Sequence, residues 1–142
     1  MSYEDIVADF EFLDDWEDRY RYVIELGRGL DPLPQEAHNE HNKVHGCVSQ
    51  VWLETSIDDP TAKDPVLHFK GDSDAHIVSG LVAIMLKLFS GRPASEILAT
   101  DAMAALKQLG LDENLTPQRS NGLASMIQRL KSDAQKALDH TS

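Results

Sequence analysis

The residues best suited to chemistry lie between positions 38 and 47 of the chain. His38, His41 and His45 precede Cys47, which is the only cysteine among the 142 residues. A thiolate is both a nucleophile and a metal ligand, and the imidazole of histidine is the commonest metal-ligating side chain. This segment therefore admits two kinds of chemistry: metal binding, or reaction at the thiol of Cys47.

Metal binding would use the histidine spacing of i, i+3 and i+7, which places all three rings on one face of a helix. Cys47 would complete a tetrahedral set of ligands suited to zinc. However, Asn39, Asn42 and Gly46 disfavour a helix here, so the metal itself would have to order the loop. We therefore predict no metal site, and a metal-binding protein built on this histidine-rich loop is kept only as an alternative.

The surroundings of Cys47 favour a thiol that is held in place but accessible. Free cysteine is among the most buried residue types, so a small buried side chain is the simplest interpretation. Gly46, however, lets the backbone turn where no side chain would fit, and Cys47 follows a polar loop at the start of an expected strand. A lone cysteine forms neither an internal disulfide nor a Cys-x-x-Cys redox pair.

Two strands are expected on the carboxyl side of Cys47. A period of two is expected from Val48 to Thr55, with Trp52 and Glu54 on one face and Val51 and Leu53 on the other, and a second strand is expected over 66–71. The turn-rich segment 56–65 separates them, and the polar, proline-containing segment 30–43 delivers the chain to Cys47.

Helical periodicity fills most of the remaining sequence. Two N-terminal helices are expected, one over 3–13 with a Ser2–Asp5 capping box and one capped by Asp14 or Asp15 and closed by a left-handed Gly27 or Gly29. The strongest signal predicts a core helix between an N-cap at Ser73 and a C-cap at Gly91. Shorter helices are expected over 94–100 and 101–110, and a long one from Thr116–Pro117 toward His140. These elements predict an α+β fold in which a small antiparallel sheet packs against several helices, as a single domain over residues 1–142.

The composition excludes several classes of partner. The chain has 13 Lys+Arg against 24 Asp+Glu, a formal net charge of −11 that repels nucleic acid and anionic lipid. The N-terminus has no targeting pattern, and no window reaches the roughly 18 apolar residues of a membrane span. We expect a cytoplasmic protein that binds neither nucleic acid nor membranes.

Three blocks of the sequence resemble the SufE family of sulfur acceptors. The segment VHGCVSQVWL carries the family pattern V-x-G-C-x-S-x-V-W at Val44, Gly46, Cys47, Ser49, Val51 and Trp52. The segment GDSDAHIVSGLVAIML matches a second block through Asp72, Ser73, Asp74 and Gly80, and LTPQRSNGLASMI a third through Arg119, Gly122 and Leu123. The segment DRYRYVIELGRGL also resembles the family's second helix, so the blocks cover nearly the whole chain in the family's order.

The resemblance implies a SufE/IscU-like fold and a role in iron-sulfur cluster assembly. Cys47 would accept a persulfide sulfur from a cysteine desulfurase (SufS- or CsdA-like), stimulate that enzyme, and deliver the sulfur to a SufBCD-like scaffold. The pyridoxal phosphate (PLP) cofactor would belong to the desulfurase, and this chain would hold none. It would act as a sulfurtransferase-type carrier, not as a stand-alone enzyme. The alternative is a binding module, a protein that activates the desulfurase by docking on it and carries no sulfur.

The resemblance also nominates residues around the thiol. Asp74, Arg119, Gly46 and Ser49 are expected to position Cys47 or contact the partner. His45 matches no family pattern, but it stands two residues from Cys47 and, if protonated and close, would lower the pKa of the thiol, against the net charge of −11, which tends to raise it. Asp74 is expected in the first turn of the core helix, where a carboxylate suits the helix dipole. Arg119 near a helix start is unfavourable for the dipole, which predicts a carboxylate partner in this chain or on the desulfurase.

Overall fold

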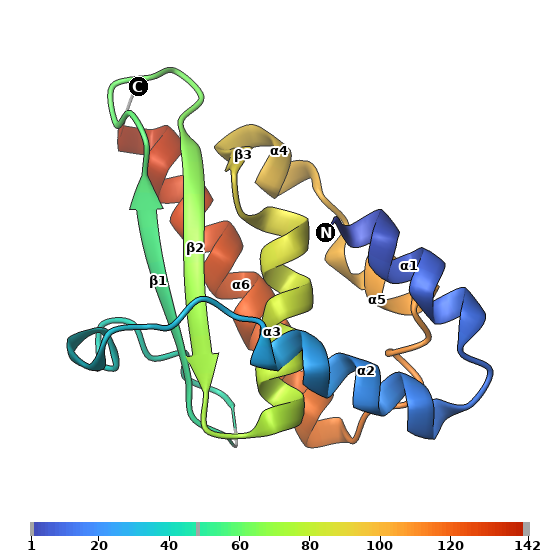
Figure 1. The fold of residues 1–142 in the computed structure, drawn as a ribbon. Coiled ribbons are helices and arrows are strands. Elements are labelled where there is room, and N and C mark those ends of the chain that lie inside the picture. The colour runs from blue at the N-terminus through green and yellow to red at the C-terminus, as the bar shows by residue number, and fades with distance from the viewer. Residues whose placement is uncertain (1, 48, 141–142) are drawn as a thin grey trace.

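The helices and strands follow one another in the order that the hydrophobic pattern predicts. The computed structural model describes residues 2–47 and 49–140 (Figure 1). Along these residues the elements are α1 (Tyr3–Phe12), α2 (Trp16–Arg28), the 3₁₀ turn η1 (Gln35–Ala37), β1 (Val51–Ile57), β2 (Val66–Ser73), α3 (His76–Phe89), β3 (Arg92–Pro93), α4 (Ala94–Ala99), α5 (Ala102–Gln108) and α6 (Pro117–His140). None of the helices in these ranges is long and apolar enough to cross a membrane.

The sheet is antiparallel, with strand order β1-β2-β3. The β1–β2 register runs from Val51 opposite Ser73 to Ile57 opposite Leu67, and the two residues of β3 pair with the start of β2. The predicted α+β class with a small antiparallel sheet is therefore confirmed. The β3 strand was not predicted, because two residues are too few to show a period.

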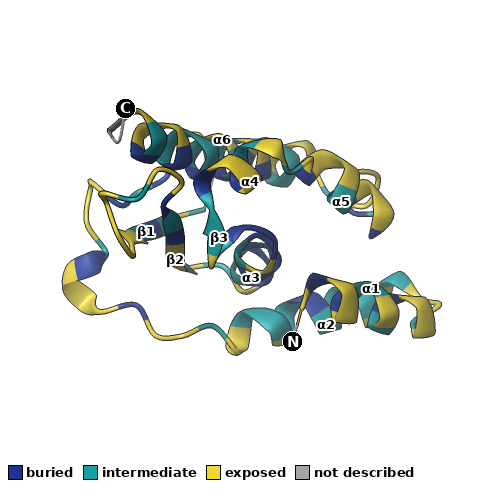
Figure 2. Ribbon diagram, turned by 90° about the horizontal axis from the view of Figure 1, so that it is seen from above, coloured by how far each residue is buried: buried dark blue, intermediate teal, exposed yellow. Residues whose placement is uncertain are grey.

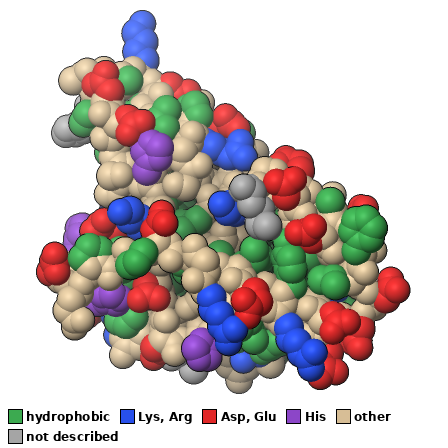
Figure 3. Space-filling view, viewed as in Figure 1, with side chains coloured by type: hydrophobic (Ala, Val, Ile, Leu, Met, Phe, Trp, Pro, Cys, Tyr) green, Lys and Arg blue, Asp and Glu red, His purple; other side chains and the backbone are tan. Residues whose placement is uncertain are grey.

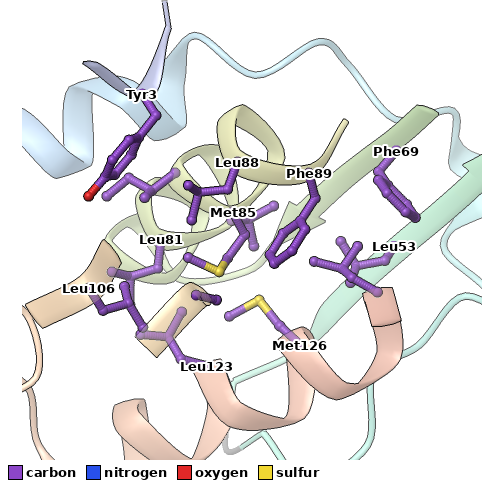
Figure 4. Packing of buried hydrophobic residues seen from close by; sticks show 14 of the residues in the cluster. Tyr3, Leu53, Phe69, Leu81, Met85, Leu88, Phe89, Leu106, Leu123 and Met126 are labelled. Carbon is purple, nitrogen blue, oxygen red and sulfur yellow. The ribbon is translucent and has the colours of Figure 1, made fainter. Parts of the chain in front are cut away.

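The core lies around α3, which occupies the middle of the molecule beside the sheet. Helix α6 lies on one side of α3, and α1 and α2 lie on the other (Figures 1 and 2). Figure 4 shows Met85 and Phe89 of α3 packed with Leu53 of β1 and Met126 of α6, and all four side chains are buried. A helix surrounded on several sides needs an apolar circumference, which explains the strong apolar signal of this segment.

Local signals placed several helix ends correctly. Ser2 and Asp5 form the reciprocal capping box of α1, and Asp15 caps α2 through the amide of Glu17. At the start of α6, the amide of Arg119 donates to Oγ1 of Thr116 at 3.3 Å.

The predicted left-handed closure of α2 is wrong. Gly29 has a φ of −86° and Gly27 lies inside the helix. The glycine at position 27 instead allows α2 to approach α3, because a Cβ atom there would lie 2.6 Å from the amide nitrogen of Gly80.

Two predicted boundaries also differ from the structure. Strand β1 begins at Val51; Val48, where the strand was expected to begin, lies outside the described residues. Helix α3 begins after Ala75 instead of after Ser73, because β2 continues to Ser73, whose hydroxyl donates to the carbonyl of Gln50. At the other end, Gly91 has a φ of +79° and follows the C-cap Ser90, so the left-handed turn expected at this glycine is present.

Candidate functional site

Cys47 lies on a loop that is closed at its base by main-chain hydrogen bonds. The amide of Val44 donates to the carbonyl of Val51 at 2.8 Å, and the amide of Leu53 donates to the carbonyl of Asn42 at 2.8 Å. These bonds use the edge of β1 that faces away from β2. Residues 45–47, 49 and 50 therefore lie between two paired segments and form the loop that carries Cys47.

The carboxyl end of this loop is fixed by Asp74. The amide of Gln50 donates to Oδ1 of Asp74 at 3.0 Å, and the amide of Asp74 donates to the carbonyl of Gln50 at 3.2 Å. Asp74 precedes α3 and does not belong to its first turn, which corrects the expectation from the sequence. In this structure Asp74 stabilises the loop, because its carboxylate accepts a hydrogen bond from the loop backbone.

Gly46 allows the loop to approach α6 closely. Its φ is +93°, a conformation that glycine adopts without strain, and a Cβ atom there would lie only 2.5 Å from Oγ of Ser125. A side chain at position 46 would thus strain the backbone and clash with α6. The tight contact directs the next residue, Cys47, toward the start of that helix.

The thiol of Cys47 faces a pocket of about 330 Å³ between the loop, α3 and α6. Its Sγ donates to the carbonyl of Gly122 at 3.5 Å. The described lining residues are Cys47, Ser49, Val78, Leu81, Thr116, Gln118, Arg119, Gly122 and Met126. Partial burial raises the pKa of the Cys47 thiol above its ordinary value of 9.0, so the resting side chain is neutral near pH 7.

His45 does not contact the thiol. Its Nε2 lies 3.2 Å from Oε1 of Glu40, and its side chain is 69% exposed. The hydrogen bond of the thiol goes to Gly122, and burial is the cause of the raised pKa. The expected effect of His45 on the thiol thus finds no support in the resting structure, because the ring belongs to a separate ion pair.

The three histidines of the loop do not converge on one point. The Nε2 atom of His38 lies 2.7 Å from Oδ2 of Asp72, and the ring packs edge-on against Trp52. His41 lines a groove between β1 and α6 instead. Across residues 2–47 and 49–140, no group of three or more His, Cys, Asp or Glu side chains is arranged to hold a metal ion. The structure therefore gives the metal-binding alternative no support.

Within this chain, Arg119 contacts an aromatic ring and not the carboxylate that was one of its two expected partners; a carboxylate on the desulfurase stays a prediction. Its guanidinium lies over the ring of Tyr20 in α2, 5.7 Å from the centroid, as in a cation–π contact. Within the described part of the chain, no carboxylate lies within ion-pair distance of it. The sequence could not indicate this partner, because the two residues meet only after α2 and α6 have packed.

The sequence analysis also did not predict which apolar residues form the walls of the pocket. Val78, Leu81 and Met126 appeared in the sequence as core positions of helices, which they are, since each is buried. Their second role depends on the start of α3 and the first half of α6 lying beside the Cys47 loop. The one residue of the family blocks that pointed to this contact was Gly122, where a Cβ atom would lie 3.4 Å from the sulfur of Cys47.

Fold and site together define an α+β protein with one cysteine, held on a loop over a partly apolar pocket. The chain belongs to the SufE family: the family model described as "Fe-S metabolism associated domain" matches residues 4–134. Membership places the protein in iron-sulfur metabolism.

Similar proteins agree with this assignment. The chain is 58% identical over 134 residues to an uncharacterized SufE-like protein of Rhizobium etli, covering 94% of this chain and 89% of the relative. It is 56% identical over 137 residues to an uncharacterized SufE-like protein of Rhizobium meliloti, covering 96% of this chain and 97% of the relative. The solution structure of a hypothetical protein from Thermus thermophilus has the same fold, with a TM-score of 0.74 and 20% identity over 98% of this chain and 99% of that one.

Proposed function

We propose that this protein is a sulfur acceptor and carrier in iron-sulfur cluster assembly. Cys47 takes a persulfide sulfur from a PLP-dependent cysteine desulfurase of the SufS or CsdA type and passes it to a SufBCD-like scaffold. The observation that carries the proposal is the placement of the sole cysteine on a loop, half-buried over a pocket. Membership of a family associated with iron-sulfur metabolism supports it.

The proposed transfer is a displacement at sulfur. The Cys47 thiolate attacks the terminal sulfur of the persulfide on the desulfurase, and a new S–S bond forms between Cys47 and that sulfur. The S–S bond of the donor persulfide breaks, and the donor cysteine leaves as a thiolate with the electron pair. One thiolate and one persulfide are consumed and one of each is formed, so the transfer needs no external oxidant or reductant.

A carrier with a single cysteine is suited to this chemistry. A second nearby thiol would attack the new persulfide, release sulfide and leave a disulfide. The chain has no second cysteine, so that loss cannot occur within one molecule. It also lacks the several thiolates that usually hold an iron-sulfur cluster, which argues for a carrier instead of a scaffold.

The pocket supports a carrier that is inactive until it docks. The raised pKa keeps the thiol protonated, and its hydrogen bond to Gly122 holds it against α6. The pocket volume of 330 Å³ is roughly ten times the 30 Å³ share of one water in the liquid, so it has room for an added sulfur. Among the described lining residues Arg119 alone is cationic, and it would stabilise negative charge on a thiolate or persulfide.

The test is the intact mass of the protein after incubation with the desulfurase and free cysteine. We expect a gain of one sulfur that reductant removes and that peptide mapping locates on Cys47. Cys47→Ser should gain nothing and should lose the stimulation of desulfurase turnover. Stimulation by Cys47→Ser equal to that of the wild type would instead identify an activator that carries no sulfur.

A further inference from the structure

The first residues of the Cys47 loop border a second hollow of about 270 Å³ on α6. Its described lining residues are Lys43, Val44, His45, Ser125, Gln128, Arg129 and Ser132. It shares no lining residue with the pocket of the thiol. We call it the Lys43 pocket.

The side chains around the Lys43 pocket are predominantly hydrogen-bond donors. Lys43 and Arg129 contribute cations, Gln128 an amide, and Ser125 and Ser132 hydroxyls. No aspartate or glutamate is among the described lining residues, although the chain as a whole carries a net charge of −11. This local reversal of charge and the concentration of donors characterise a site for an anion.

Arg129 is held in position by groups outside the pocket. Its Nε donates to Oδ2 of Asp133 at 3.1 Å, its Nη2 donates to the carbonyl of Leu53 at 3.4 Å, and its side chain is only 22% exposed. Within the described residues, Nη1 of Arg129 and Nζ of Lys43 have no hydrogen-bond or ion-pair partner. A fixed guanidinium loses little further entropy when it binds an oxyanion, so the site is partly preorganised.

The backbone of Lys43 is also fixed, so the two cations face the hollow from stable positions. The amide of Lys43 donates to the carbonyl of Asn39 at 3.0 Å, and the residue forms a β-bridge with Trp52. The charge of Arg129 is balanced by Asp133, and that of His45, when protonated, by Glu40. Lys43 is therefore the cation whose charge an incoming anion would neutralise.

We propose that the Lys43 pocket binds a small oxyanion of the phosphate or carboxylate class between Lys43, in the paired segment just before the loop, and Gln128, Arg129 and Ser132 on α6. A bound oxyanion joins the beginning of the Cys47 loop to α6 beside the close contact of Gly46 with Ser125. Occupancy thus holds the loop in its resting position and slows exposure of the thiol. This inference is independent of sulfur transfer, since binding and thiol exposure are both measured on the protein alone.

The test is a titration of the full chain followed by NMR, with inorganic phosphate in one series and acetate in the other, at constant ionic strength set with chloride. We expect saturable shifts confined to the amides of residues 43–46 and 125–132, and the tighter of the two anions identifies the chemical group. Lys43→Gln should weaken binding about fivefold, the upper range for an exposed charge pair. Gln128→Glu, which puts a carboxylate among the donors, should abolish it.

Lys107→Gln is the control, because it removes the same charge from an exposed position on α5. Shifts that grow linearly, or that are equal in the wild type, Lys43→Gln and Gln128→Glu, would show a general ionic effect and overturn the site. The second readout is alkylation of Cys47 by iodoacetamide. Saturating anion should slow it in the wild type but not in Gln128→Glu, and an unchanged rate in the wild type would disprove the link to the loop.

Discussion

Cys47 and His38 both have raised pKa values, but the favoured protonated form is neutral for the thiol and charged for the imidazole. Partial burial favours the neutral thiol of Cys47. The ring of His38 faces an acceptor at each nitrogen, with Nδ1 3.0 Å from the carbonyl of Pro34 and Nε2 2.7 Å from Asp72. A neutral imidazole has one N–H, so only the imidazolium can donate to both. The hydrogen bond to Asp72 accordingly raises the pKa of His38.

The His38–Asp72 pair should contribute stability that depends on pH. Because the folded-state pKa of His38 is raised, its contribution is complete below the ordinary value of 6.5 and is lost as the pH rises through the folded pKa. We expect His38→Gln to lose about 0.5–1 kcal/mol more stability at about pH 5.5 than at about pH 9, a range reduced for the partial exposure of the pair. Denaturant unfolding at the two pH values measures this difference.

The matched control for this prediction is His41→Gln, at an exposed histidine of the same loop. It removes a histidine from the same loop and leaves the contact with Asp72 intact, so the difference between the two variants isolates the His38–Asp72 pair. Equal losses for His38→Gln at both pH values would mean that the ring contributes by packing on Trp52 alone.

At the scale of elements, the Cys47 loop depends on contacts with the end of β2 and with α6. One end is paired to β1, the other is hydrogen-bonded to Asp74, and the middle contacts α6 at Ser125 and Gly122. The thiol contributes one long hydrogen bond of 3.5 Å to this arrangement. Release of the loop end at Gln50 should therefore be enough to expose the sulfur.

Asp74→Ala should loosen that loop end, which, within the described residues, would then be attached only through the carbonyl of Gln50. It removes the acceptor for the amide of Gln50, at a cost of about 1 kcal/mol. We expect faster alkylation of Cys47 in the free protein, with little change in global stability beyond that cost. Asp74→Asn, which keeps an acceptor oxygen, should stay close to the wild-type rate. An unaltered rate in Asp74→Ala would show that Asp74 does not control exposure of the thiol.

The contact between α2 and α3 depends on the absence of a side chain at Gly80. A Cβ atom there would lie 2.0 Å from the carbonyl oxygen of Val23, so α2 and α3 would have to move apart. We expect Gly80→Ala to destabilise the fold by about 3 kcal/mol or more, despite the better helix propensity of alanine. Thermal unfolding followed by circular dichroism measures the loss. Gly29→Ala, whose Cβ would lie 3.5 Å from the carbonyl oxygen of Leu26, should be nearly neutral.

At the scale of the whole molecule, a partly buried ionic network joins β1 to α6. Asp133 accepts hydrogen bonds from Arg129 and from Oγ1 of Thr55 at 2.6 Å, and Arg129 also donates to the carbonyl of Leu53. The two charged side chains are 22% and 14% exposed. The network links segments more than 70 residues apart in the sequence.

Asp133→Ala should destabilise the protein by roughly 3 kcal/mol, because Arg129 would then remain largely buried without its counterion. The double variant Arg129→Met/Asp133→Leu should recover most of this loss, since apolar side chains of similar volume need no partner. Glu96→Ala is the control, because it breaks the exposed Arg92–Glu96 pair of the same i,i+4 spacing and should cost at most about 0.5 kcal/mol. Chemical denaturation compares the three variants. Equal losses in Asp133→Ala and Glu96→Ala would mean that burial of the network is unimportant.

The charge of the molecule is unevenly distributed. Residues 4–18 contain eight acidic side chains and no lysine or arginine. Figure 3 shows acidic side chains gathered over α1 and α2. Helix α1 has no lysine or arginine, whereas α2 also carries Arg19, Arg21 and Arg28, so a protein that docks on α1 should present basic groups there.

The sequence by itself determined the helices, the two long strands and the residue most suited to chemistry. Capping residues such as Ser2 and Thr116 act within one turn, and the apolar, β-favouring run that begins at Val51 lies within a single strand, so neither signal needs a partner segment. Cys47 was identifiable because it is the only thiol and stands inside a recognisable motif.

Only the tertiary structure decided the surroundings of that thiol. Met126, Val78 and Gly122 line the pocket of Cys47 because α3 and α6 pack beside the sheet. Arg119 contacts Tyr20 because α2 and α6 are brought together in the fold. Ser73 looked like a helix cap until its pairing with Val51 extended β2. Contacts between distant segments depend on how whole elements pack, and the spacing of residues within one segment does not predict that packing.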